Sequence, residues 1–460
     1  MSNEKYKIIR LNIFILFLLA AFPLFTQQNT EASRRDTIMY GTDTEITSLI
    51  QALRSENEDY LDNELLALAL SSRNQNILTG IFGFFGAREK SGLEQRAMDV
   101  VSNRLSETND TVFAALEYLG NLKTPEAVPV VLELLDTEER RFLAVGFRVA
   151  GKVGSVDPQS ADETAAFLID YYENRTPGTD NQSIIITAIG ETRSSAAVQF
   201  LVDIAVNVDE RLGLRTAALS ALSKIGDEAG LEAILSCVTT NDPYVRTAAV
   251  AALGPFSGDA VDSAILDAFR DSFYRSRIAA AQASSVRKLE AAVPYLRYRA
   301  ERDAEAVVKD EAIRALGAIA NSEALEALES LFFTRTNPDR VRILSSEMLM
   351  KGSGSAYFTR ITVELEEARV KNQTSLYNGI LKSVGEAVVQ GDTAEVQRVA
   401  HNFMRNGTLI EKLYGLDMAA NNGLTGLREE IIALAGDRNE TIKQRALRTA
   451  GKLGISITND

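Results

Sequence analysis

Arginine and tyrosine side chains gather in one segment of this sequence, and together they could bind an anionic partner. Residues 270–302 hold eight basic and three acidic residues, whereas the whole chain has a formal net charge of −14. Aromatic residues alternate with the basic ones, and Arg and Tyr are favoured at the energetic centres of protein interfaces. The segment therefore predicts a binding site for an acidic peptide or another anionic ligand, formed by Arg275, Arg277, Tyr295, Tyr298, Arg299, Arg302 and Arg335.

The sequence contains few residues of the types that catalyse reactions or bind metal ions. The sequence contains one histidine, His401, one cysteine, Cys237, and no tryptophan. A catalytic triad would depend on His401, which lies in a predicted helix and is expected to have a surface or capping role. Cys237 lies on an apolar helix stripe, where we expect a buried, unreactive thiol. We therefore predict no catalytic residue, no metal site and no cofactor, in a chain that is not an enzyme.

One glycine string needs a separate interpretation. Gly80, Gly83 and Gly86 are spaced three residues apart, but phenylalanines stand between them at positions 82, 84 and 85. A phosphate-binding loop follows a strand and has a different spacing of glycines. The string therefore predicts a packed helix and no phosphate cradle.

The elements that must position these residues repeat along the chain. A hydrophobic residue followed by glycine recurs at intervals of 30 to 36 residues between Phe85 and Ile319, and the glycine is predicted to end a helix. A fixed period of this length is typical of a solenoid, in which each unit buries its apolar face against its neighbours. The copies are Phe85-Gly86, Leu119-Gly120, Val153-Gly154, Ile189-Gly190, Ile225-Gly226, Val384-Gly385 and Leu453-Gly454, with degenerate copies at Phe256-Ser257, Val286-Arg287 and Ile319-Ala320.

One unit of the repeat is clear between Arg215 and Thr240. An apolar helix stripe runs from Ala218 to Ile225, and Gly226 can end that helix because it adopts the left-handed conformation without a Cβ penalty. A second apolar stripe follows from Leu231 to Val238. The unit is therefore predicted to be an antiparallel helix pair with short loops.

The residues of this unit also resemble a known family. The string NDPYVRTAAVAAL, from Asn241 to Leu253, resembles the short HEAT-like repeat first described in the phycobilin lyases, and the resemblance extends roughly from Asn74 to Ile455. Tetratricopeptide repeats would need large aromatic residues at set positions, and ankyrin repeats a histidine-containing turn. The resemblance implies an all-α, right-handed α-α superhelix of about eleven or twelve helix pairs.

Two interpretations of the basic segment stay open. The second helix of each pair is expected to line the concave face of a solenoid, and Tyr295, Arg299 and Arg302 follow one another at helical spacing on such a helix. The first interpretation is therefore a binding site on the concave face. In the second, the arginines pair with acidic residues of neighbouring repeats and the tyrosines pack between repeats.

The start of the chain predicts export. Residues 1–26 combine a basic start with about fifteen mostly apolar residues, as in a secretory signal peptide; the alternative is retention of residues 11–25 as an inner-membrane anchor. No cysteine follows the apolar run, which argues against lipidation.

Residues 27–43 are polar and predict a disordered lead-in. Residues 44–460 then predict one continuous solenoid with a kink near Lys351. We expect a location in the periplasm or cell envelope.

These features favour a non-catalytic interaction scaffold that binds an unidentified protein or acidic peptide through the concave face of the solenoid. The strongly acidic chain argues against nucleic acid as a partner, because that binding needs a basic surface. The alternative function is a HEAT-like, lyase-type enzyme or small-ligand carrier that uses the groove. A self-associating structural protein is a further alternative.

Overall fold

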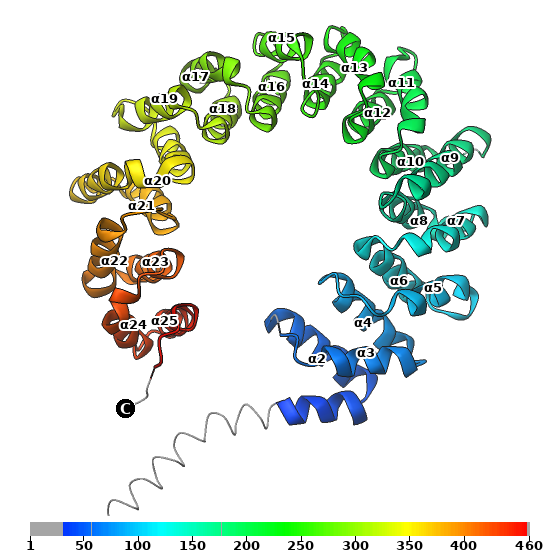
Figure 1. Ribbon diagram of the computed structural model, residues 1–460, viewed down its shortest axis with the longest axis horizontal. Coiled ribbons are helices and arrows are strands. Elements are labelled where there is room, and N and C mark those ends of the chain that lie inside the picture. Colours follow the sequence, from blue (N-terminus) through cyan, green and yellow to red (C-terminus); the bar gives the residue numbers. More distant parts are fainter. Residues whose placement is uncertain (1–30, 57, 176, 458–460) are drawn as a thin grey trace, which may run out of the picture. The chain divides into compact units, whose positions relative to one another are not determined.

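The computed structural model describes residues 31–56, 58–175 and 177–457, and in these residues it contains helices and no strand. The chain divides into two compact units, unit 1 up to Gly230 and unit 2 from Leu231 onward (Figure 1). The all-α fold and the antiparallel helix pairs agree with the sequence prediction. Each unit is described by itself below.

Unit 1 is built from helix pairs in two rows. The first helices of successive pairs pack side by side and lie on the inside of the bend of the unit, and the second helices form the outer row (Figure 1). The first helices are α2 (Asp43–Glu56), α4 (Gln75–Gly86), α6 (Asn109–Leu122), α8 (Arg140–Val153), α10 (Thr179–Thr192) and α12 (Leu212–Ile225); the second helices are α3 (Asp62–Ser71), α5 (Glu94–Ser102), α7 (Val128–Asp136), α9 (Pro158–Asn174) and α11 (Val198–Val206).

Unit 2 has a two-row arrangement of its own. Its inner row holds α14 (Pro243–Ala252), α16 (Tyr274–Arg287), α18 (Ala306–Ile319), α21 (Thr374–Gly385), α23 (Leu409–Asn421) and α25 (Glu440–Leu453). Its outer row holds α13 (Leu231–Val238), α15 (Asp259–Ala268), α17 (Val293–Arg302), α19 (Ser322–Phe333), α22 (Ala394–Asn406) and α24 (Arg428–Ala435). The expectation that second helices line the concave face is therefore wrong for this chain.

The long helix α20 (Asp339–Val370) folds back on itself and supplies both members of one pair. The guanidinium of Arg342 donates a 2.8 Å hydrogen bond to Glu364, 22 residues further along the same element. In a straight helix those residues would lie about 33 Å apart. The chain therefore reverses between them, within the segment where the sequence predicts a kink near Lys351.

The periodic glycines do not all end helices, which corrects the sequence interpretation. Gly120 and Gly190 of the periodic set lie inside first helices, and Gly151 and Gly317, three residues before the copies at Gly154 and Ala320, take the same position; the next first helix approaches all four closely. A Cβ on Gly190 would lie 2.6 Å from the Cα of Ala221, and one on Gly151 would lie 2.7 Å from the carbonyl oxygen of Ala188. Glycine is needed at these positions because two helix backbones meet there.

Several of these helices end three residues after the packing position in a left-handed residue, which is often not glycine, whereas α8 ends at Gly154 in the right-handed region. Gly226 and Gly454 are left-handed caps, as predicted, with φ of 69° and 66°. Elsewhere the left-handed residue is Lys123, Arg193, Lys288 or Ala320. The hydrophobe-glycine pattern therefore merges two series of positions, one for packing and one for capping, which are separated by about one helical turn.

The predicted disordered lead-in is wrong for its described part. Residues 31–40 form a helix that precedes α2. Ile38 is buried in this helix, Arg34 donates to Glu56 and Arg35 donates to Glu64. One buried apolar side chain and two ion pairs thus hold this mostly polar segment against α2 and α3.

The predicted signal peptide, residues 1–26, lies outside the described residues. Along the described ranges, from residue 31 to residue 457 with gaps at 57 and 176, no helix has both the length and the hydropathy that a membrane span requires.

Candidate functional site

Most of the predicted binding residues stabilise the repeats internally. Arg277 is buried and donates two hydrogen bonds, of 2.7 and 2.8 Å, to the carboxylate of Asp303, whose side chain is fully buried. It also donates to the carbonyl oxygens of Asp271 and Ser272 in the turn before its own helix. This arginine connects α16 to the loop that enters α18, and it is not available to a partner.

The fourth residue of several first helices repeats this arrangement. Arg215, Arg246 and Arg342 also donate to backbone carbonyls of the segment before their helix. Arg246 binds Asp271 at 2.9 Å, as Arg277 binds Asp303. A basic residue at this position is therefore a structural part of the repeat.

The residues of α17 are also partly occupied. Tyr295 stacks on Phe269 with ring centroids 5.7 Å apart, and its hydroxyl accepts from Arg270. Arg299 donates to the carbonyl of Phe269 and to Asp303, and it lies over the exposed ring of Tyr298. Because α17 belongs to the outer row, none of these residues lies on the concave side of unit 2.

Arg335 forms ion pairs with Glu364 and Glu367 of α20. Together with Arg277 and Arg299, it fits the second interpretation of the basic segment, in which arginines pair with acidic residues of neighbouring repeats.

Two predicted residues keep their charge available. Among the described residues, no carboxylate lies within ion-pair distance of Arg275 or Arg302, and both side chains are exposed. The Arg277–Asp303 pair joins the two elements that carry them, because Arg275 begins α16 and Arg302 ends α17. Both arginines therefore lie at the same edge of unit 2, where first helices start and second helices end.

An aromatic cluster surrounds Arg275 at this edge. Tyr244, which is 47% exposed, meets Phe273 edge-on with centroids 5.2 Å apart, and Phe273 lies 5.6 Å from Tyr274. The guanidinium of Arg275 lies 5.8 Å from the rings of both tyrosines and donates to the Tyr274 hydroxyl. That hydrogen bond raises the pKa of Arg275. We call Tyr244, Phe273, Tyr274, Arg275 and Arg302 the edge patch.

The sequence analysis missed Tyr244, although the repeat register contains the signal. Tyr244 stands two residues before Arg246, and Arg275 stands two residues before Arg277. The two side chains therefore occupy the same position in neighbouring repeats, and that position projects from the edge. Alignment on the structural arginine would have placed them side by side.

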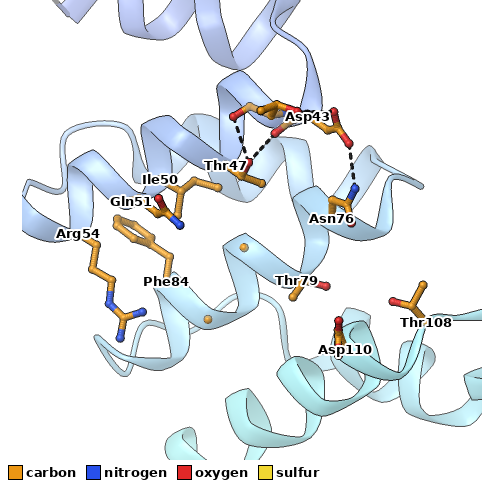
Figure 2. A pocket seen from close by; sticks show the side chains of 13 residues that line it. Asp43, Thr47, Ile50, Gln51, Arg54, Asn76, Thr79, Phe84, Thr108 and Asp110 are labelled. Carbon is orange, nitrogen blue, oxygen red and sulfur yellow. Dashed lines mark hydrogen bonds between the residues drawn. The ribbon is translucent and has the colours of Figure 1, made fainter.

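A groove in unit 1 is the second surface with converging polar groups. It crosses the inner row over α2 and α4, reaches the start of α6, and has a volume of about 510 Å³. Figure 2 shows Arg54 and Gln51 toward one end and Asp43, Asn76 and Asp110 toward the other. Hydrogen bonds from Asn76 and from the backbone N–H of Thr44 lower the pKa of Asp43, which favours its carboxylate form.

The remaining chemical candidates have structural positions. Cys237 is 3% exposed, in agreement with the expected buried thiol. The Nδ1 of His401 lies 3.1 Å from the carboxylate of Glu430 in α24, on the outer row. Within the described ranges, no group of histidine, cysteine and acidic side chains has the geometry of a metal site.

Comparison with known proteins identifies the family. The family model described as spirochaete HEAT repeat protein matches residues 38–449. The chain belongs to this family. This match confirms the predicted resemblance to HEAT repeats. It does not concern the phycobilin-lyase subtype. No curated protein sequence matches the chain.

Solved structures that resemble this HEAT repeat protein do so at low identity. Kap95p, solved with RanGDP, is 13% identical, with a TM-score of 0.48 and coverage of 85% of this chain and 60% of that one. Kap121p bound to Ste12p is 13% identical, with a TM-score of 0.43 and coverage of 91% and 52%. Human deoxyhypusine hydroxylase is 17% identical, with a TM-score of 0.25 and coverage of 58% and 98%. The chain thus spans about half the length of Kap121p.

Proposed function

We propose that this protein is a non-catalytic interaction scaffold of the bacterial cell envelope, which binds an acidic segment of a protein partner through the edge patch. The observation that carries the proposal is the pairing pattern of the arginines. Arg277, Arg299 and Arg335 are held by carboxylates, whereas Arg275 lies beside the exposed ring of Tyr244 and the half-buried ring of Tyr274, with no carboxylate of the described residues within ion-pair distance. An arginine beside tyrosines is a favoured composition for the centre of an interface.

The edge patch replaces the concave face as the proposed binding surface. Arg275 keeps its terminal guanidinium N–H groups available, because within the described part of the chain it donates only through Nε, to the hydroxyl of Tyr274. The guanidinium lies 5.8 Å from the ring centroids of Tyr244 and Tyr274, so a partner that covers the patch would shield an ion pair between Arg275 and its own carboxylate from water. Arg302 supplies a second positive charge on the next element. A segment with acidic residues flanked by apolar ones complements this surface.

The envelope location is supported by the sequence of residues 1–26, with the alternative of an anchor formed by residues 11–25. Mass spectrometry of the N-terminus of the protein isolated from its own cells separates the two. A mature chain that begins near residue 27 supports export with cleavage. An intact N-terminus in the membrane fraction supports the anchor, and an intact N-terminus in the cytosol contradicts an envelope location.

Site-specific crosslinking in cells tests the edge patch. A photoreactive phenylalanine analogue at Tyr244 is expected to capture one predominant partner, and Arg275→Glu should reduce that product at least about tenfold. Arg297→Glu is the matched control, because Arg297 is exposed on α17 and its one ion pair among the described residues is with Glu301, within its own helix. Capture that is unaffected by Arg275→Glu, or equally reduced by Arg297→Glu, would contradict the proposal.

A further inference from the structure

The groove of unit 1 has charges of opposite sign at its two ends. Arg54 lies near the end of α2, while Asp43 lies at its start and Asp110 at the start of α6 (Figure 2). Eleven residues separate Asp43 from Arg54, which corresponds to about 16 Å along a helix. Among the described residues, the side chains of Gln51, Arg54 and Asp110 have no hydrogen-bond or ion-pair partner. The groove is therefore dipolar along its length, and part of its polar lining is unused.

Few side chains project from the floor of the groove, which leaves room for a polypeptide backbone. Gly80 and Gly83 line it on α4, and a Cβ on Gly83 would meet no atom within 4 Å. Ile50 and Phe84, which are buried, form its apolar base. Gly83 differs in this respect from Gly86 on the same helix, where a Cβ would lie 3.3 Å from the Cα of Tyr118. Of the three glycines of the string, Gly83 alone faces open space, since a Cβ on Gly80 would contact Ile50 at 3.4 Å.

The walls carry uncharged groups that hydrogen-bond. Gln51 on α2 has no internal partner among the described residues. The side chains of Thr44, Thr47, Asn76 and Thr79 already donate hydrogen bonds inside unit 1, but their oxygens can still accept from a ligand. A helical ligand satisfies its own backbone groups and would gain little from such walls. An extended peptide displays a free N–H and C=O at every residue, and each needs a partner when it leaves water. The lining thus favours an extended main chain over a helix.

We propose that this groove binds an extended peptide segment of about five residues, with a positive charge at the end next to Asp43 and Asp110 and a carboxylate at the end next to Arg54. The length follows from about 3.3–3.6 Å per extended residue over the span of the groove. Gly83 lets the ligand backbone approach α4, and Gln51 and Asn76 meet its amide groups. This site lies in unit 1 and does not depend on the edge patch of unit 2.

Calorimetric titration of the full chain with defined peptides tests the proposal. The probe is Lys-Ala-Thr-Ala-Glu, acetylated and amidated, and its control is Gln-Ala-Thr-Ala-Gln with the same caps. We expect the probe to bind with a Kd of about 1 mM or tighter and the neutral control to bind at least about fivefold more weakly. Absence of probe binding at that concentration overturns the proposal.

Two variants locate the binding. Gly83→Leu fills the groove without touching the fold, so it should weaken probe binding at least about tenfold. Gly451→Leu is the matched control, since it also places a side chain on a helix where no atom lies within 4 Å, but on α25. It should bind the probe as the unmodified chain does. Equal binding by Gly83→Leu and Gly451→Leu would remove the groove as the site.

A charge exchange assigns the orientation. Arg54→Glu should weaken binding of Lys-Ala-Thr-Ala-Glu and should instead favour Lys-Ala-Thr-Ala-Lys, because the new carboxylate then faces a lysine. Arg54 is exposed and makes no internal ion pair among the described residues, so the exchange leaves the fold intact. If the preference for the two peptides does not reverse, the proposed pairing of Arg54 with a ligand carboxylate is wrong.

Discussion

Replacement of Asp303 by alanine is expected to destabilise the α16–α18 region by about 3–5 kcal/mol, because it leaves the buried guanidinium of Arg277 without its carboxylate. Repeat proteins unfold region by region, so the loss should be largest where the ion pair lies. Hydrogen exchange of amides in α16, α17 and α18 measures it directly. Protection lost throughout unit 2 to the same degree would contradict a local effect.

A double replacement is the control for this prediction. Arg277→Met combined with Asp303→Leu removes both charges and fills similar volume, and such replacements of buried ion pairs are often neutral or stabilising. We therefore expect the double variant to be more stable than Asp303→Ala alone. If the two variants are equally unstable, the loss comes from altered packing and not from the unpaired charge.

The same ion pair gives a pH dependence with a definite sign. Burial is the largest single influence and would raise the pKa of Asp303. The hydrogen bonds from Arg277 and from the backbone N–H of Glu305, together with the positive charges of Arg277 and Arg299, outweigh it and hold the pKa below its usual value. The unfolded carboxyl has a pKa of about 3.9. The stabilisation from a depressed pKa is present above that value and is lost as the pH falls toward the folded pKa. Acid titration followed by hydrogen exchange should show α16–α18 losing stability below about pH 4. Asp303→Asn, which cannot titrate, should lack this step.

Gly190→Ala is expected to cost about 1–3 kcal/mol, although alanine is the better helix former. The added Cβ would lie 2.6 Å from backbone and side-chain carbons of Ala221, so α10 and α12 would have to move apart. The free energy of unfolding of the variant, from urea titration, measures the effect.

Gly451→Ala is the matched control for this second prediction. It changes the corresponding residue of α25, where no atom lies within 4 Å of the new Cβ. Only the helix preference remains there, and it favours alanine by about 1 kcal/mol. The same substitution should therefore have opposite signs at the two positions. A loss of stability in both variants would show that the close approach of α10 to α12 is not what matters.

The fold could be predicted from the sequence because its period and its apolar stripes are local patterns. The exact role of each glycine could not be predicted. Gly190 packs against the next helix and Gly226 caps its own helix, yet both follow the same type of hydrophobic residue. Whether a glycine packs or caps depends on how close the neighbouring helix lies, and the residues next to the glycine in the sequence do not reveal that.

The candidate site was predicted in part for a similar reason. Arg275 and Arg277 lie two residues apart and contribute equally to the local charge. Asp303 forms an ion pair with Arg277 and not with Arg275. It lies 26 residues beyond Arg277 and contacts it only because the repeats stack. Charge counting therefore located the segment that carries most of the edge patch, and the partners of each arginine had to come from the structure.

The glycine contacts also set how strongly each unit bends. First helices that meet at glycine lie closer together than helices separated by larger side chains, because interaxial distance depends on the residues at the contact. Each repeat is thus a wedge whose thin side is the inner row. Ser285 and Met350 stand eight residues after Arg277 and Arg342 in unit 2, the position that glycine holds in other repeats. Larger residues there make blunter wedges, so the local radius of curvature is encoded by one side chain per repeat.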